Sequence, residues 1–319
     1  MYKVLIPEDI ALSGKEYLKS HGYTLKVGVP TDVESLKREI ADADALLVRN
    51  APYPEEVLEA GSKLKVVARH GTGTDNIAVK AAEEMGIWVV NGPTANINTV
   101  AEYTLAMILA LSCHMVYFDT YTRKGDWSKR LQVKRSDLFG KTLGIVGFGR
   151  IGQLVAEKAH KGLGMKVLAY DPRSFDVLPQ GVQHTDDIDH VLAQSDFVTV
   201  HLPSTPQTKG MFDYEAFCKM KPSAFFINCA RGDTYIEADL VRALQKGKIA
   251  GAGIDVYANE PCINSPLFAL EQVIVSQHNA GLSQEANDKM SLHAAMGIHE
   301  VLSGGTPTWQ VNAPKECRK

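Results

Sequence analysis

Residues Lys141–Pro172 read KTLGIVGFGRIGQLVAEKAHKGLGMKVLAYDP. Thr142 to Val146 is a short apolar run of the kind found in buried strands, and three glycines follow within the next six residues. Ile151 to Gly162 then has the pattern of a helix that ends in glycine, and Lys166 to Tyr170 is a second apolar run. The stretch therefore predicts a strand, a glycine turn, a helix and a strand, in that order.

The glycine turn has the spacing of a phosphate-binding motif. Gly147 allows a tight turn, Gly149 lets the backbone approach a pyrophosphate, and Gly152 lets the helix pack closely on the strand. Arg150 and Ile151 stand where the predicted helix starts, and free N–H groups at a helix start can bind phosphates. The motif therefore predicts a site for a dinucleotide.

Asp171 closes the second strand and lies 171 − 152 = 19 residues after the last glycine of the motif. At about this spacing a carboxylate meets the hydroxyls of the adenosine ribose. The same carboxylate would repel a 2′-phosphate, so the sequence predicts NAD rather than NADP as the cofactor. Arg173 is close enough in sequence to weaken that preference.

The composition is that of an ordinary globular protein with room for two domains: 319 residues, 45% hydrophobic and 22% charged. The net charge is -3, and Lys and Arg are spread along the chain, so we expect neither nucleic acid nor an anionic membrane as a partner. The apolar run from Leu105 to Leu111 is far shorter than the roughly 20 residues of a spanning helix.

The cysteines and the N-terminus indicate the compartment. The chain has five cysteines, an odd number, with no C-x-x-C pair. This pattern argues against a disulfide framework and against a zinc site, so we expect no metal. The N-terminus, MYKVLIPEDI, lacks a signal-type apolar region. We therefore expect a cytoplasmic protein.

The first ninety residues alternate between strand and helix patterns. Strands are expected at Tyr2–Ile6, Leu25–Val29, Ala45–Val48, Leu64–Arg69 and Trp88–Val90, and helices at Ser13–His21, Val33–Ala41, Glu55–Ala60 and Ile77–Met85. Such alternation predicts a small parallel sheet with helices on its faces. Residues Asn98 to about Arg123 then read as one long helix, apolar on more than one face.

The alternation resumes after the glycine motif. Further strands are expected at Phe197–His201, Ala224–Asn228, Ile249–Asp255 and Val273–Ser276, and helices at Ile188–Gln194, Tyr214–Met220 and Glu237–Lys246. With the first two strands this makes six, the number in a complete dinucleotide fold. The last helix, Ser283–Leu302, has no strand to follow it, so we expect it to return to the first domain.

The predicted fold class is α/β, with two doubly wound parallel-sheet domains. A Rossmann cofactor domain, residues 98–283, is inserted into a flavodoxin-like substrate domain, residues 1–97 and 284–319. The inserted domain includes the long linking helix, residues 98–123.

Three polar stretches follow predicted strands, where ligands of open α/β sheets bind. Arg231 follows one strand and could hold a carboxylate, although a surface ion pair is an equally good reading. Asp255 ends the next strand, where it could instead cap a helix or form a turn. His278 lies beyond the last strand, and most histidines taken singly are not catalysts.

Together these stretches supply what hydride exchange at a 2-hydroxy acid needs. His278 can exchange a proton near neutral pH, and Glu260 can stabilise its charged form. Arg231 can hold the substrate carboxylate and polarise the carbonyl.

The chain resembles the D-isomer-specific 2-hydroxyacid dehydrogenase family, which includes phosphoglycerate dehydrogenases and hydroxypyruvate reductases. The resemblance rests on the glycine motif and on RHGTGTDNI, NTVAEYTLAMIL, HLPSTPQT, NCARGD, GIDVYANEP and QHNAG, in this order along the chain. It implies that Arg231, Glu260 and His278 are catalytic. It also implies that the nicotinamide and ribose are lined by Leu202, Pro203, Thr208, Cys229, Ala230 and Asp255, along with Arg231 and His278.

The resemblance implies two further properties. The loop at His70, Thr72 and Gly73 would offer N–H groups to the substrate carboxylate, and the long helix would form a homodimer. Four positions depart from the family pattern without removing a reacting group: Gln277, Ser283, Ile236 and Ala78. The sequence stops at Lys319, so we expect it to lack the regulatory domain of longer phosphoglycerate dehydrogenases.

The predicted function is that of an NAD-dependent oxidoreductase that reduces a small 2-oxo acid such as hydroxypyruvate or glyoxylate, or acts on a compound like 3-phosphoglycerate. One alternative is an NAD(H)-sensing corepressor of the same fold. Another is a phosphite-type dehydrogenase; a formate-type enzyme is disfavoured because that family has glutamine at the position of Glu260. Arg49 follows a predicted strand and could contact the far end of the substrate or pair with Glu55 or Glu56.

Overall fold

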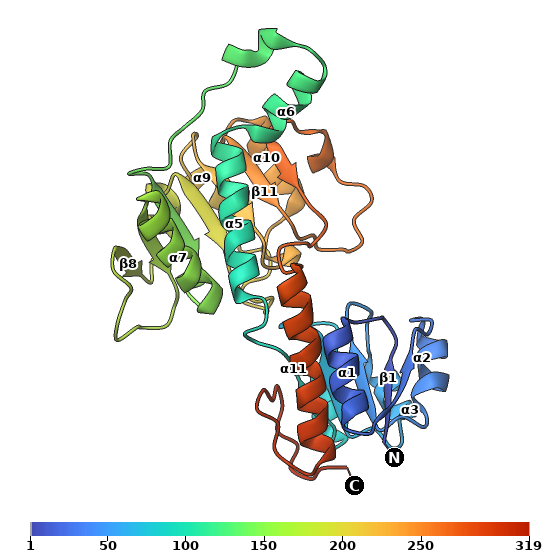
Figure 1. Cartoon of the computed structure of the whole chain (residues 1–319). Coiled ribbons are helices and arrows are strands. Elements are labelled where there is room, and N and C mark those ends of the chain that lie inside the picture. Colours follow the sequence, from blue (N-terminus) through green and yellow to red (C-terminus); the bar gives the residue numbers. More distant parts are fainter. Residues whose placement is uncertain (1, 319) are drawn as a thin grey trace. The chain divides into compact units, whose positions relative to one another are not determined.

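The computed structural model describes residues 2–318 (Figure 1). The chain divides into two compact units, one with the residues up to Asn96 and from Leu282 on, the other Ile97–Gly281. The sequence prediction put the two boundaries one and two residues further along, at 97/98 and 283/284. We call these unit 1 and unit 2.

Unit 1 holds a five-stranded parallel sheet in the order β2-β1-β3-β4-β5. This is the flavodoxin-like order, as predicted. Its strands are β1 (Lys3–Ile6), β2 (Thr24–Val27), β3 (Ala45–Val48), β4 (Val66–Arg69) and β5 (Trp88–Val90), and its helices are α1 (Leu12–Ser20), α2 (Val33–Ile40), α3 (Glu55–Ala60), α4 (Val79–Glu84) and α11 (Gln284–Leu302). All lie within two residues of their predicted bounds.

Helices cover both faces of this sheet. Residues of α2, α3 and α4 pack against one face, and residues of α1 and α11 against the other. Helices α1 and α11 approach closely at Gly14, where a Cβ atom would lie 2.4 Å from Ser291 Oγ. The Ser291 hydroxyl donates to the Ala11 carbonyl, 2.9 Å away, so the last helix is fixed to the first.

The C-terminal stretch after α11 runs beside β5. Gln310 forms an antiparallel bridge with Val90. The buried Asn312 side chain accepts from Val89 N at 2.7 Å and donates to the Ile87 carbonyl at 2.9 Å. The backbone groups on this side of β5 are therefore hydrogen-bonded.

Unit 2 holds a seven-stranded parallel sheet in the order β12-β11-β10-β9-β6-β7-β8. The strands are β6 (Thr142–Val146), β7 (Lys166–Tyr170), β8 (Val182–Thr185), β9 (Phe197–Val200), β10 (Phe225–Asn228), β11 (Gly251–Ile254) and β12 (Val273–Val275). Counted from β6, this is the Rossmann order with one strand added at the β12 edge. The predicted fold class is confirmed.

The prediction of six strands for this unit was wrong, because β8 was missed. Its sequence is VQHT, with only Val182 buried. A short polar edge strand lacks the apolar run by which the others were found. The helices are α7 (Arg150–Leu163), α8 (Ile188–Gln194), α9 (Tyr214–Lys219) and α10 (Glu237–Gln245), with short 3-10 turns η1 (Trp127–Leu131), η2 (Gly232–Thr234) and η3 (Pro266–Ala269).

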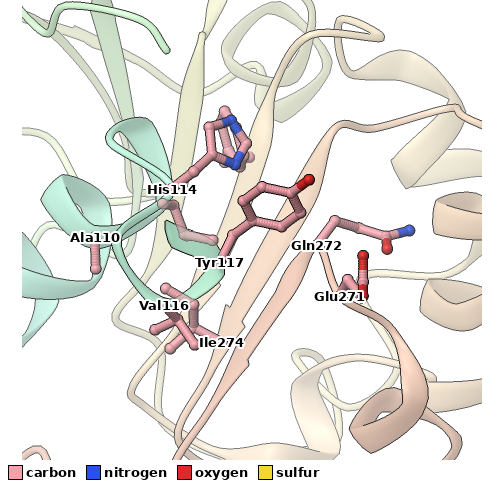
Figure 2. A pocket seen from close by; sticks show the side chains of 9 residues that line it. Ala110, His114, Val116, Tyr117, Glu271, Gln272 and Ile274 are labelled. Carbon is pink, nitrogen blue, oxygen red and sulfur yellow. The ribbon is translucent and has the colours of Figure 1, made fainter. Parts of the chain in front are cut away.

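The prediction of one helix over residues 98–123 was also wrong. The segment forms α5 (Ile97–Ser112) and α6 (Met115–Arg123), which meet at 60°. His114 at the break has φ 50°, in the left-handed region that a helix cannot continue through. No glycine or proline marks the break in the sequence, so the pattern gave no sign of it. Near the bend lies a small pocket whose lining includes Ala110, Tyr117 and Ile274 (Figure 2).

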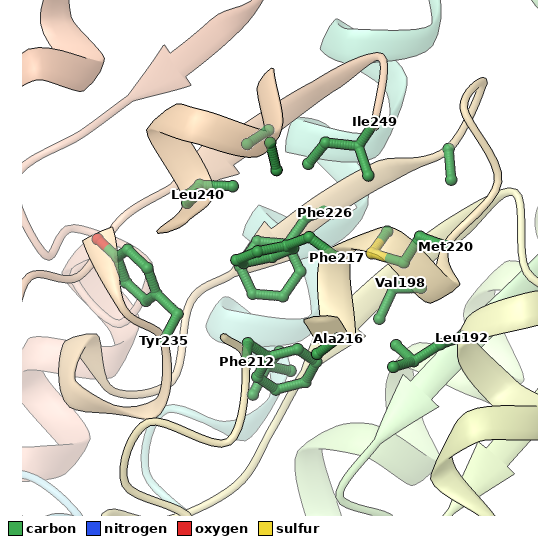
Figure 3. Packing of buried hydrophobic residues seen from close by; sticks show 14 of the residues in the cluster. Leu192, Val198, Phe212, Ala216, Phe217, Met220, Phe226, Tyr235, Leu240 and Ile249 are labelled. Carbon is green, nitrogen blue, oxygen red and sulfur yellow. The ribbon is translucent and has the colours of Figure 1, made fainter. Parts of the chain in front are cut away.

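The core of unit 2 lies on both faces of its sheet. Figure 3 shows part of one face, where Phe217 of α9 and Tyr235 each pack against Phe226 of β10. On the other face α5 and α7 pack against β6 and β10. Among residues 2–318, no single helix is both long and apolar enough to cross a membrane; only the bent pair α5 and α6, taken together, meets the length and composition of a span.

Candidate active site

The glycine turn lies between β6 and α7, at the carboxyl end of β6 in unit 2. Gly147 has φ 96°, and a Cβ atom there would meet the His201 backbone at 2.7 Å. At Gly152 a Cβ atom would lie 2.4 Å from the Gly147 carbonyl oxygen. At Gly149, by contrast, nothing lies within 4 Å of a built Cβ. The turn is therefore closely packed at Gly147 and Gly152 and open at Gly149, which fits a dinucleotide pyrophosphate at the start of α7.

Asp171 follows β7 and is 4% exposed. Its Oδ2 accepts from Phe148 N at 2.9 Å, and its Oδ1 accepts from Arg173 N at 3.0 Å. The Arg173 guanidinium also holds the carboxylate, through Nε at 2.8 Å and Nη2 at 2.9 Å. The side-chain hydrogen bonds from Arg173 lower the pKa of Asp171 to about 2, so it is charged at neutral pH.

Arg231 follows β10 in a loop that Asn228 holds. The buried Asn228 side chain accepts from Ala230 N at 2.9 Å and donates to the Arg231 carbonyl at 3.0 Å. At Gly232 a Cβ atom would lie 1.9 Å from the carbonyl carbon of Tyr257, so this loop lies directly against the one leading to Glu260. The sequence analysis missed Asn228, although an asparagine at the end of an apolar strand is a signal for a local side-chain turn.

Glu260 and His278 form an ion-pair geometry in which Oε2 lies 2.7 Å from Nδ1. Glu260 Oε1 accepts from Tyr257 N at 2.9 Å. Burial acts to raise the pKa of Glu260, but the hydrogen bonds from His278 and from the Tyr257 N–H outweigh it and hold that pKa below its ordinary value. The imidazole is fixed on Nδ1, and its side chain remains 49% exposed.

Asp255 lies behind His278 and is fully buried. Its Oδ1 accepts from Asn279 N at 2.8 Å and from Ser276 Oγ at 2.5 Å, while its Oδ2 accepts from Ala280 N at 2.9 Å. The His278 N–H donates to the Asp255 carbonyl at 2.7 Å, and His278 has φ 56°. Asp255 therefore fixes the backbone that carries the histidine.

The remaining predicted cofactor residues follow the carboxyl ends of β9 and β10. Leu202 is buried, and its side chain would contact a Cβ at Gly147. The Thr208 hydroxyl donates to the Pro203 carbonyl at 2.6 Å and closes that loop. Cys229 is buried with its Sγ 3.8 Å from Met107 Sδ, and Ala230 donates to Asn228 as described.

The predicted substrate residues Arg49, His70, Thr72 and Gly73 lie at the carboxyl edge of the unit 1 sheet. His70 follows β4 and is 5% exposed; burial, together with the charges of Arg49 and Arg69, lowers its pKa to about 4. The Thr72 hydroxyl donates to Asn96 Oδ1 at 3.0 Å, and the Gly73 carbonyl accepts from Arg69 Nε at 2.8 Å.

Arg49 follows β3, and its Nη1 donates to the Asp9 carbonyl at 2.8 Å. Of the acids considered as its partners, Glu56 instead pairs with Lys37 at 3.3 Å.

The chain is similar in sequence to known proteins over most of its length. Residues 105–280 match the model of the NAD binding domain of D-isomer specific 2-hydroxyacid dehydrogenases. A D-3-phosphoglycerate dehydrogenase of Mycobacterium tuberculosis is 44% identical over 278 residues, which cover 86% of this chain and 52% of the relative. One from Methanocaldococcus jannaschii is 37% identical over 98% of this chain and 60% of its own length. The chain thus spans between half and two thirds of these relatives.

Solved structures match over nearly their whole length. A protein of Thermus thermophilus has a TM-score of 0.90 at 31% identity, covering 97% of this chain and all of its own. The NADPH-dependent glyoxylate/hydroxypyruvate reductase of Sinorhizobium meliloti, in complex with NADP and malonate, has a TM-score of 0.89 at 26% identity, covering 100% of this chain and 99% of its own. The chain therefore belongs to the D-isomer-specific 2-hydroxyacid dehydrogenase family.

Proposed function

We propose that the protein is an NAD-dependent oxidoreductase that reduces a small 2-oxo acid to the D-2-hydroxy acid. Hydroxypyruvate, glyoxylate and phosphorylated three-carbon acids are the candidate substrates. The Glu260–His278 pair carries the proposal, because carbonyl reduction requires a proton donor, and this imidazole is held on Nδ1 by a carboxylate while its side chain stays half exposed.

The cofactor, when bound, supplies the hydride that reaches C2 of the substrate. His278 gives the proton to the carbonyl oxygen from Nε2, while Glu260 stabilises the charged imidazolium that is ready to give it. Arg231 binds the substrate carboxylate and places positive charge near the oxygen, where negative charge develops.

Residues of unit 1 bind the substrate in this proposal. The backbone of His70, Thr72 and Gly73 offers N–H groups to the carboxylate, and Arg49 contacts the far end. The support is positional: these residues follow β3 and β4 at the edge of an open sheet where ligands bind. Because its pKa is about 4, His70 is neutral at neutral pH and brings no charge to this edge.

The test is NADH oxidation with glyoxylate, pyruvate, hydroxypyruvate and hydroxypyruvate phosphate. Turnover that disappears in His278→Ala supports the proposal. A chain that binds NADH but turns over none of these acids would instead be a binding protein, such as a corepressor. Reduction of NAD by phosphite tests the remaining alternative, because phosphite gives up a hydride and does not accept one.

The Arg49 contact has its own test. Arg49→Ala should raise KM for hydroxypyruvate phosphate about tenfold, which corresponds to about 1.4 kcal/mol. KM for pyruvate should stay nearly unchanged. Lys37→Ala is the matched control, since it removes another positive charge of unit 1, one that pairs with Glu56. Equal effects on both substrates would show that Arg49 is structural.

The proposal includes a homodimer in the cytoplasm. Helix α6 buries none of its residues, and large apolar side chains are exposed in α6, Met115 59% and Val116 52%, and in η1 after it, Trp127 74% and Leu131 88%. Light scattering should give a dimer, and Trp127→Glu with Leu131→Glu should give monomers. The five cysteines are free thiols, which suits a reducing compartment.

A further inference from the structure

The carboxylate of Asp171 is saturated with hydrogen bonds. A carboxylate offers about four lone-pair positions, and four donors occupy them here: Phe148 N, Arg173 N, Arg173 Nε and Arg173 Nη2. The 2′- and 3′-hydroxyls of an adenosine ribose need two of these positions. Ribose binding to Asp171 and the present position of the Arg173 guanidinium therefore exclude each other.

The four donors differ in how easily they leave. The two backbone N–H groups belong to the turn itself and remain wherever the turn is formed. The guanidinium lies on a side chain that is 66% exposed, whereas the Asp171 side chain is 5% exposed. Because Arg173 is in water, it can exchange its carboxylate for solvent at low cost. Its departure frees two acceptor positions, the number that the ribose needs.

Once displaced, the guanidinium stays beside the ribose, because the backbone N–H of Arg173 remains bonded to Asp171. The Phe175 ring offers the guanidinium a second contact, because Arg173 Cζ already lies 5.8 Å from the centroid of that ring. The Phe175 ring packs between the rings of Phe148 and His184, with centroid-to-centroid distances of 5.3 Å and 5.2 Å. A guanidinium in this position is suited to a 2′-phosphate, which it can bind through two N–H groups.

We propose that Arg173 is a specificity-determining residue with two positions: it neutralises Asp171 when no cofactor is bound, and it binds the 2′-phosphate when the cofactor is NADPH. An aspartate alone would reject NADPH by repulsion. With Arg173 the chain should accept both cofactors, with only a modest preference for NADH. This inference rests on the proposed function, because it assumes that unit 2 binds the cofactor in the glycine turn.

The experiment measures Kd for NADH and for NADPH by quenching of protein fluorescence, with the full chain and three variants. Arg173→Ala should raise Kd for NADPH about tenfold and leave Kd for NADH unchanged or lower, because Asp171 then has free acceptors. Arg173→Lys should recover part of the NADPH affinity. Arg123→Ala is the control, since it breaks another Arg–Asp pair, with Asp119 at 2.9 Å, on the exposed α6.

The outcomes are separable. If Kd for NADH and Kd for NADPH rise together in Arg173→Ala, or if neither Kd changes, Arg173 does not select the cofactor. The inference then fails while the proposed function stands. If the unaltered chain binds neither nucleotide, both fail. Raised salt gives a second readout. In the unaltered chain it should raise Kd for NADPH more than Kd for NADH, and this difference should be smaller in Arg173→Ala.

Discussion

Asp171 and Asp255 occupy equivalent places in one sheet and have different roles. Each follows an apolar strand of unit 2, and each is almost fully buried. Asp255 uses both oxygens within its own neighbourhood, accepting from Asn279 N, Ala280 N and Ser276 Oγ. Asp171 accepts one distant backbone N–H, from Phe148, and takes its side-chain donors from the exposed Arg173. The same residue type thus builds a fixed loop in one place and an exchangeable binding position in the other.

The loop that Asp255 fixes carries the proton donor, so the largest effect is expected there. His278→Ala should lower kcat by about 10²- to 10⁴-fold, because proton transfer is lost. Kd for NADH should change little, because the glycine turn and Asp171 are untouched. Stopped-flow turnover and fluorescence titration measure the two quantities. A variant that keeps more than a tenth of the original kcat would exclude His278 as the donor.

Asp255→Asn should break the fixed loop. An amide nitrogen would face a backbone N–H, and one buried hydrogen bond would be lost, costing about 1–3 kcal/mol of unfolding free energy. Turnover should fall as well, because His278 is no longer held. Asp196→Asn is the control: Asp196 accepts from Thr142 N at 2.9 Å at the amino ends of β6 and β9, away from the site, so the change should cost stability without lowering kcat. A normal kcat in Asp255→Asn would show that the loop holds itself.

Asp171→Ser should affect the cofactor alone. Kd for NADH should rise about tenfold, or about 1.4 kcal/mol, while kcat at saturating NADH stays the same. The preference for NADH over NADPH should narrow. Asp176→Ser removes the same charge from an exposed position a few residues away and should change neither Kd. If Asp171→Ser lowered kcat at saturation, the distinction between the two aspartates would not hold.

The smallest effect concerns pH. The pKa of Asp171 is lowered from 3.8 to about 2, chiefly by the Arg173 hydrogen bonds, so folding favours its charged form. Its contribution to stability is therefore complete above about pH 4 and is lost as the pH falls towards 2. The ratio of NADH Kd between Asp171→Ser and the unaltered chain should stay flat from about pH 5 to 8. A ratio that changes in this range would mean that another group titrates with the ribose site.

The sequence predicted the regular parts of the molecule because their signals are local. The strand, turn and helix around Gly147 follow from apolar runs and glycine spacing. Arg231 and His278 could be picked out because they follow predicted strands, and Glu260 because it comes after Asp255 in the same polar stretch. The edge strand β8 and the bend at His114 escaped, because one is polar and the other has no glycine or proline. The different roles of Asp171 and Asp255 also escaped, since they depend on donors from Phe148, Asn279 and Ala280 that only the folded backbone brings into reach.

The C-terminal stretch beside β5 has a consequence for solution behaviour. An uncovered edge strand of a parallel sheet is a template on which another chain can add a strand. Gln310 and Asn312 occupy that edge of unit 1, so self-association through β5 is blocked by the chain itself. Loss of the Asn312 amide, as in Asn312→Ala, would leave Val89 N and the Ile87 carbonyl unpaired, and this edge would then be open to pairing with another chain.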